Sequence, residues 1–153
     1  MVSMYRFSSP GNLDLKQIYQ HARDCYPNEC CGFVLKRGTK TCINIINELH
    51  KLDPATYSRT ATEGFAFSAE DTLYLSKNIS SANPIVAIYH SHPDVGAYFS
   101  QEDKDNALFE NELIWPVDYL VVDINEWMVV GSKLFRFLDG DFHEIAIFEG
   151  LDI

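Results

Sequence analysis

Basic residues are scarce in this chain of 153 residues, with 12 Lys and Arg against 22 Asp and Glu and a formal net charge of −10. A surface of this sign repels the phosphate backbone, so we expect no nucleic-acid partner. It favours a protein partner with a basic face instead, mainly by speeding association.

Long apolar runs are also missing. No segment approaches the roughly 20 consecutive apolar residues that a membrane helix needs, so we expect no membrane partner. The first residues, Met1 to Arg6, lack the apolar core of a signal peptide, and we expect a cytoplasmic protein. The composition, 46% hydrophobic and 22% charged, is that of an ordinary globular protein, and the length suits a single domain over residues 1–153.

The cysteines do not form the two spaced pairs of a zinc ribbon; they are Cys25, Cys30, Cys31 and Cys42. Adjacent residues on a strand face opposite sides, so Cys30 and Cys31 do not easily bind one metal ion. We therefore expect buried free thiols. A nucleophilic cysteine paired with His90 stays open as an alternative, although no motif supports it.

What the chain does contain is an apolar strand that leads into two histidines. Residues 85–89 are apolar throughout, and His90 and His92 follow with one residue between them. Because side chains on an extended backbone alternate between faces, both imidazoles converge on one point at the carboxyl end of the strand. Pro93 cannot donate to a strand ladder and is predicted to end the strand.

A short loop and the start of a helix come next. Gly96 permits a tight path, and Ser100 stands where a helix N-cap would, with Asp103 at the third helical position and able to turn back toward the histidines. Two neutral imidazoles and one carboxylate are a ligand set for zinc that leaves the fourth tetrahedral position to water, as in catalytic sites. The alternative is two hydrogen-bonded surface histidines and an Asp103 that only favours the helix dipole.

The rest of the chain predicts a mixed sheet with two or three helices, an α/β (α+β) fold. Helices are predicted over residues 12–24, from 68 to about 79 and from 100 to about 110. Strands are predicted over residues 30–36, 41–47, 65–67, 117–124, 127–137 and 142–148. Residues 48–64 are expected to be an irregular loop that is functional or mobile. Gly131 is expected to mark a bulge or a bend, and His21 to face solvent.

Glu29 stands at the entrance of the strand predicted over residues 30–36. With it, the chain carries Glu, then His-x-His, seven residues, Ser, two residues and Asp. This pattern resembles the JAMM signature of MPN-domain (JAB) zinc metalloproteases, and the segment Pro-Asn-Glu-Cys-Cys-Gly at residues 27–32 resembles small bacterial and phage-tail members. The resemblance covers nearly the whole chain. It implies an MPN/JAB-like curved mixed sheet and zinc-dependent hydrolysis of amide bonds, often isopeptide bonds at the carboxyl terminus of ubiquitin or a ubiquitin-like protein.

The resemblance also implies a role for each residue of the pattern. His90, His92 and Asp103 would hold one Zn²⁺ per chain, at about 2.0–2.2 Å. Glu29 would accept a proton from the zinc-activated water and pass it to the departing amine. Ser100 would donate a hydrogen bond to the oxyanion, a role that can coexist with capping the helix.

The resemblance favours a ubiquitin-like or sulfur-carrier protein as substrate. Its extended tail would add beside a sheet edge near residues 48–66, residues 94–99 and Trp115. Two alternatives stay open: a phage-tail-like peptidase that acts on a structural protein or peptidoglycan, and an MPN scaffold that binds a partner without turnover. Because the chain keeps every residue of the signature, catalysis is favoured over the scaffold role.

Overall fold

A computed structural model describes residues 14–153 of the chain. The amino-terminal segment 1–6 and the helix start expected at Asn12 lie outside the described residues. The helices are α1 (Leu15–Cys25), α2 (Ile46–Leu52), α3 (Ala69–Asn78) and α4 (Gln101–Ala107). The strands are β1 (Cys31–Leu35), β2 (Thr39–Cys42), β3 (Ile85–Pro93), β4 (Leu108–Phe109), β5 (Glu112–Leu113), β6 (Asp118–Ile124), β7 (Val129–Leu138) and β8 (Asp141–Leu151).

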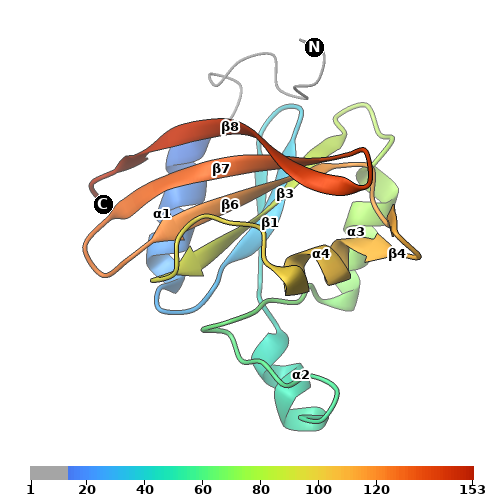
Figure 1. The fold of residues 1–153 in the computed structure, drawn as a ribbon, viewed down its shortest axis with the longest axis horizontal. Coiled ribbons are helices and arrows are strands. Elements are labelled where there is room, and N and C mark those ends of the chain that lie inside the picture. Colours follow the sequence, from blue (N-terminus) through green and yellow to red (C-terminus); the bar gives the residue numbers. More distant parts are fainter. Residues whose placement is uncertain (1–13) are drawn as a thin grey trace.

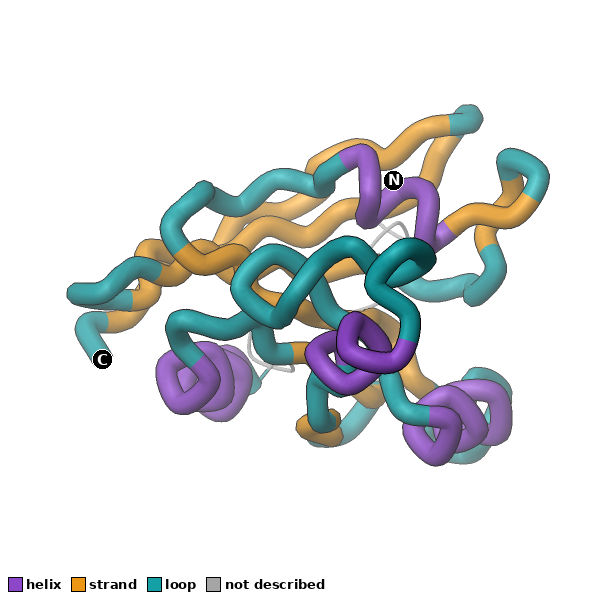
Figure 2. The backbone as a smooth tube through the Cα atoms, turned by 90° about the horizontal axis from the view of Figure 1, so that it is seen from below, coloured by secondary structure: helices purple, strands orange, loops and turns teal. Residues whose placement is uncertain are grey.

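Six of the strands form one sheet in the order β2-β1-β3-β6-β7-β8, and β4 pairs with β5 in a separate small hairpin (Figure 1). The pair β3–β6 is parallel, and the other neighbours in the large sheet are antiparallel. The predicted mixed α/β fold is therefore confirmed, with four helices among residues 14–153 rather than two or three. The helices lie at separate positions around the sheet in the view from below (Figure 2).

Alternation along β3 divides the core between the two faces of the sheet. Ala87 and Tyr89 pack with Tyr19 and the other buried residues of α1 on one face. Ile88 belongs to the opposite cluster, together with Phe99 and with buried residues of α3 and α4. Because side chains repeat every two residues, His90 and His92 follow Ile88 onto the face that carries α4.

The end of the first hairpin differs from the prediction. The expected strand over residues 41–47 is β2, which ends at Cys42, and part of the loop expected over residues 48–64 is helical, because α2 starts at Ile46. Asn44 causes the break: its Oδ1 atom accepts hydrogen bonds from the N–H groups of Ile46 and Ala66, as in an Asx turn. The strand predicted over residues 65–67 was also wrong, because this segment runs as loop and takes no part in a sheet ladder.

Helix α4 ends at Ala107, one turn earlier than predicted. Glu110 and Asn111 both have positive φ, 52° and 66°, and they connect β4 to β5. Two consecutive residues with positive φ are typical of a tight two-residue hairpin turn, which a continuing helix cannot contain. Beside Gly131, the pairing of β6 with β7 shifts register by one residue, as expected for a bulge.

His21 on α1 is half-buried rather than solvent-facing. Its Nδ1 atom lies 2.7 Å from the hydroxyl oxygen of the buried Tyr89. Burial lowers the pKa of His21, with Asp24 opposing, and burial raises that of Tyr89. The Tyr89 hydroxyl therefore donates to a neutral His21 ring. Among residues 14–153, no helix combines the length and the apolar character needed to cross a membrane.

Candidate metal centre and active site

Strand β3 and helix α4 bring together two imidazoles and one carboxylate. The Nε2 atoms of His90 and His92 lie 3.1 Å apart, and Asp103 Oδ2 lies 3.2 Å from the first and 3.4 Å from the second. All three side chains are at most 9% exposed. His90 and His92 meet because they are two residues apart on one strand, and Asp103 reaches them from the first turn of α4.

The triangle formed by these atoms fits a metal ion. Ligand atoms about 2.0–2.1 Å from a tetrahedral zinc ion lie about 3.3 Å from one another, close to the three distances in the structure. Burial lowers the pKa of His90, so its ring is neutral, the form that binds a metal. Burial disfavours the charged form of Asp103, but His90, His92 and the Ser100 N–H outweigh it and hold the pKa of Asp103 well below its ordinary range. The group could therefore hold a metal ion.

The two histidine rings are held in different ways. His92 Nδ1 lies 3.0 Å from the carbonyl oxygen of Gly96, which acts as acceptor, so Nδ1 carries the proton and the Nε2 lone pair is free for a metal. Gly96 has a φ of 92°, a conformation that suits glycine. His90 stacks on Phe65 with ring centroids 4.7 Å apart, and its buried Nδ1 atom has no hydrogen-bond partner among the described residues.

Ser100 is the N-cap of α4, as predicted. Its Oγ atom accepts a hydrogen bond from Asp103 N–H at 3.0 Å, and Asp103 Oδ2 accepts one from Ser100 N–H at 3.0 Å. This capping box fixes the carboxylate of Asp103 at the helix start, beside the histidines. The Ser100 hydroxyl serves as acceptor in this arrangement, so its own hydrogen remains available for donation.

Glu29 is buried immediately before β1, with 6% exposure. It lines a pocket of about 150 Å³ together with His92, Ser100 and Asp103, so the structure brings all five residues of the pattern to one place. We call this cavity the glutamate pocket. Burial and the negative charge of Asp103 raise the pKa of Glu29 to about 9, while Arg59 opposes the shift.

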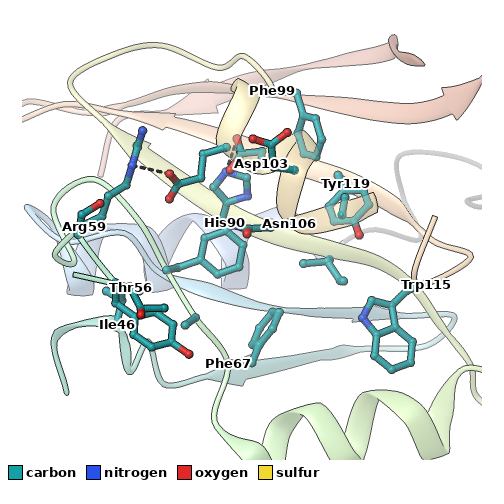
Figure 3. Close-up of a pocket in the computed structure, with 18 residues that line it drawn as sticks. Ile46, Thr56, Arg59, Phe67, His90, Phe99, Asp103, Asn106, Trp115 and Tyr119 are labelled. Atoms are coloured by element: carbon teal, nitrogen blue, oxygen red, sulfur yellow. Dashed lines mark ion pairs between the residues drawn. The ribbon is translucent and has the colours of Figure 1, made fainter. Parts of the chain in front are cut away.

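A larger pocket, of about 490 Å³, adjoins the metal ligands on another side and is lined by His90 and Asp103 as well (Figure 3). Aromatic rings make up much of its wall: Tyr57, Phe65, Phe67, Phe99, Trp115 and Tyr119. We call it the aromatic pocket. It lies between the loop that follows α2 and helix α4, so the sequence prediction placed residues 48–66 and Trp115 near the site correctly.

Comparison with known proteins identifies the family. Residues 14–133 match the family described as prokaryotic homologs of the JAB domain (Prok-JAB). The chain belongs to the prokaryotic JAB family. The predicted resemblance is thereby confirmed at the level of the family and the fold.

Solved structures similar to this JAB-family chain include two bacterial proteins with solution structures. One, from Desulfitobacterium hafniense, has 20% identity and a TM-score of 0.58, with 86% of this chain and 84% of the other covered. The second, from Salinibacter ruber, has 22% identity and a TM-score of 0.54, with 88% and 86% covered. At these identities the likeness shows the fold alone. No curated protein matches the chain in sequence.

Asn44 is a residue of the JAB-family site that sequence analysis missed. Its Nδ2 atom donates to the carbonyl oxygens of Glu29 and Gly64, both at 3.0 Å, so it ties the backbone of the glutamate to the loop that borders both pockets. The N–H of Glu29 donates to the carbonyl oxygen of Ala61 in the same loop. The available signal was an Asn inside a predicted strand, where this residue type is depleted.

Glu102 of helix α4 forms an ion pair with the loop that follows α2. Its Oε1 atom lies 2.7 Å from Arg59 Nε, and both residues line both pockets. Arg59 also donates from Nη1 to the carbonyl oxygen of Glu63. The pair therefore links the loop after α2 to helix α4 beside the metal ligands (Figure 3).

The cysteines of this JAB-family chain are free thiols, as predicted: Cys30, Cys31 and Cys42 are buried, and Cys25 is partly buried. Cys30 and Cys31 belong to the cores on opposite faces of the sheet, also as predicted. Burial raises the pKa of Cys30 and that of Cys42 to about 12, and it raises those of Cys25 and Cys31 as well. These shifts disfavour the thiolate that a nucleophilic cysteine requires.

Proposed function

We propose that this JAB-family chain is a zinc-dependent isopeptidase or peptidase that cleaves an amide bond at the carboxyl terminus of a ubiquitin-like or sulfur-carrier protein. One observation carries the proposal: the triangle of His90 Nε2, His92 Nε2 and Asp103 Oδ2 has edges of 3.1–3.4 Å, and two of its members, His92 and Asp103, line one pocket with the buried Glu29. Two neutral imidazoles and one carboxylate leave a zinc coordination position open, which is typical of hydrolytic sites.

Zinc bound there would act as a Lewis acid and would bring the pKa of a water molecule toward about 7. Glu29 would take a proton from the attacking water and deliver it to the nitrogen of the departing amine. Its position suits this role, because Glu29 lines one pocket with His92 and Asp103 and so lies beside the residues that would hold the metal and its water. The hydrogen bonds from Asn44 to the Glu29 carbonyl and from the Glu29 N–H to Ala61 keep the backbone of the glutamate fixed during this transfer.

Ser100 would stabilise the negative charge that develops on the substrate carbonyl oxygen. Its hydroxyl oxygen accepts from Asp103 N–H, so the hydroxyl hydrogen is free to donate to the substrate. A fixed donor of this kind acts most strongly in a site from which water is excluded. The role of Ser100 as helix cap therefore supports its proposed catalytic role by holding the oxygen in one position.

The substrate class is supported by the shape of the site. The aromatic pocket runs between the loop after α2 and helix α4, an arrangement that accommodates an extended tail rather than a folded surface. An extended tail can reach buried metal ligands through such a pocket, whereas a folded surface cannot. A ubiquitin-like or sulfur-carrier protein presents its reactive amide on a tail of this kind.

The direct test uses the purified chain loaded with one equivalent of Zn²⁺ and a fusion in which a carrier-protein tail is joined through an amide to a fluorescent amine. We expect hydrolysis that is lost on chelation, is restored by added zinc, and is lost in Glu29→Gln while that variant still binds zinc. Retained turnover in Glu29→Gln would reject the role of Glu29. A purified protein that does not bind zinc would support the scaffold alternative, and cleavage of muropeptides without carrier fusions would support the phage-tail alternative.

A further inference from the structure

The two pockets meet at the metal ligands but differ in chemistry. The glutamate pocket holds about 150 Å³ and includes the polar side chains of Glu29, Glu63 and Ser100. The aromatic pocket holds about 490 Å³, and its wall is formed largely by aromatic rings. A volume of this size falls within the range of about 300–1,000 Å³ that is typical of pockets for small molecules, far more than a tail of glycine residues fills.

Proton transfer decides which half of the substrate enters which pocket. The group that protonates the leaving nitrogen must lie within hydrogen-bond reach of it. Since Glu29 lines only the glutamate pocket of the two, the amine half of the amide extends toward that pocket. The acyl half then extends past the ligands His90 and Asp103 into the aromatic pocket, which both of them line.

We propose that the aromatic pocket is an acyl-side specificity site, which takes one bulky apolar or aromatic side chain from the first three residues before the scissile amide. This inference rests on the proposed hydrolytic function. It narrows the substrate class to tails that carry such a side chain, in place of tails that end in glycine alone. A substrate without such a side chain would leave the apolar wall of the pocket exposed to water and would lose the free energy gained by burying that wall.

Charge around the aromatic pocket excludes an acidic side chain at this position. Glu102, Asp103 and Asp105 line the pocket, and Arg59 is the one cation among the described residues that line it. The guanidinium of Arg59 is already engaged by Glu102 and by the carbonyl oxygen of Glu63. A carboxylate entering the pocket would therefore find no free cationic side chain among the described residues that line it, whereas an aromatic ring would meet Phe65 and Phe67, whose centroids lie 5.6 Å apart in an edge-to-face arrangement.

The test uses peptides with one common amine half and different acyl tails. The tails are an all-glycine tail and tails with a single Phe, Leu or Asp at the first, second or third position before the amide. We expect kcat/KM to rise about 10- to 200-fold when Phe or Leu occupies the favoured position, and to fall for Asp there. If the glycine tail is cleaved as fast as the best Phe tail, the inference is wrong although the proposed function stands.

A variant that fills the pocket makes the test specific. Ala66 lines the aromatic pocket. Its backbone N–H donates to Asn44 Oδ1, and its carbonyl oxygen accepts from the N–H of Ile45. We expect Ala66→Phe to lower the ratio of kcat/KM for the Phe tail to kcat/KM for the glycine tail about 10- to 100-fold. The matched control is Ala55→Phe, an exposed position in the same loop that lines neither pocket, and it should change neither substrate. Equal losses for both tails in Ala66→Phe would contradict the inference, and Ala66→Leu provides a smaller step if Ala66→Phe does not fold.

A binding measurement separates this inference from the proposed function. Trp115 lines the aromatic pocket, and Trp127 is 77% exposed on the surface, so a Trp127→Phe background reports on Trp115 fluorescence. We expect an acyl product ending in the favoured Phe residue to change that fluorescence in a saturable way, with chelator present as well as with zinc, and we expect Ala66→Phe to abolish the change. If no amide is cleaved but this binding persists, the proposed function fails and the pocket assignment stands. If the glycine product binds equally well, the pocket assignment fails.

Discussion

Ser100 and Asp103 hold each other at the start of α4 through two reciprocal hydrogen bonds, both 3.0 Å long. The backbone N–H of each residue donates to the side chain of the other, and the same Asp103 oxygen that accepts from Ser100 faces the two histidines. Helix capping and metal-ligand placement are therefore one arrangement. A local sequence rule consequently positions the carboxylate of Asp103 beside His90 and His92.

Ser100→Ala tests whether the serine has a role beyond the cap. We expect a loss of about 0.5–2 kcal/mol in the free energy of unfolding from the missing cap, and a loss of about 10²- to 10³-fold in turnover from the missing donor. Urea unfolding and steady-state kinetics measure the two effects. Ser68→Ala is the matched control, since Ser68 caps α3 by accepting from Asp71 N–H at 3.0 Å, and it should cost similar stability with turnover unchanged. Equal turnover in both variants would show that Ser100 is a cap alone.

Metal binding should stabilise the folded chain. Because the three ligand atoms converge only in the folded state, zinc at 100 times its dissociation constant should raise the free energy of unfolding by about 2.7 kcal/mol. Thermal unfolding with zinc and with chelator, together with calorimetric titration, measures this. Asp103→Asn should abolish most of the zinc-dependent gain, whereas Asp105→Asn, an exposed residue of the same helix that accepts from Gln101, should keep it. A gain that is the same in Asp103→Asn would place the metal elsewhere.

Asn44→Ala should affect activity through Glu29. It removes the two bonds donated to the carbonyl oxygens of Glu29 and Gly64 and the two accepted from the N–H groups of Ile46 and Ala66. We therefore expect a loss of about 1–3 kcal/mol in stability together with a fall in kcat. Asn83→Ala is the control: Asn83 makes two comparable backbone bonds, to Arg37 N–H and to the Arg37 carbonyl, outside both pockets. The control should leave kcat unchanged. If both variants lower kcat equally, Asn44 has only a structural role.

His21 should make stability fall as the pH falls. Its folded-state pKa is lowered below the ordinary value of 6.5, mainly by burial, so near this pH the unfolded state binds more protons than the folded state. The stability contributed by a neutral His21 is present above about 6.5 and is lost as the pH falls toward the folded-state pKa. In His21→Gln, the side-chain oxygen can still accept from Tyr89, but the group does not titrate. Urea unfolding between pH 5 and 8 measures the free energy of unfolding of both proteins. As the pH falls, the wild type should lose more stability than His21→Gln. A difference between the two that stays constant with pH would contradict this account.

Predictions based on local rules agreed with the structure. The period of two along β3 placed His90 beside His92, and the N-cap spacing placed Asp103 in the first turn of α4. The same kind of rule located α3 behind Ser68. In each case the deciding interactions span at most four residues, so the sequence contains the whole cause.

Predictions failed where a distant partner decided the local structure. Residues 41–47 have strand-like composition, but Asn44 bonds to Gly64 and Ala66 on another loop and ends the strand. His21 lies off the apolar stripe of α1, yet it is half-buried because its ring packs against the hydroxyl of Tyr89, 68 positions along the chain. Local composition contains no information about such partners.

By itself, the sequence determined the candidate ligand set, the strand and helix that carry it, and the mixed α/β class, because these depend on side-chain periodicity and on capping within one turn. Only the tertiary structure decided that Glu29, 61 positions before His90, lines one pocket with His92 and Asp103, and that Asn44 and Ala61 hold it there. It alone also showed an aromatic pocket assembled from the loop after α2, from helix α4 and from strands β3 and β6. The physical reason is that burial and long-range hydrogen bonds depend on how segments distant in the chain pack against one another.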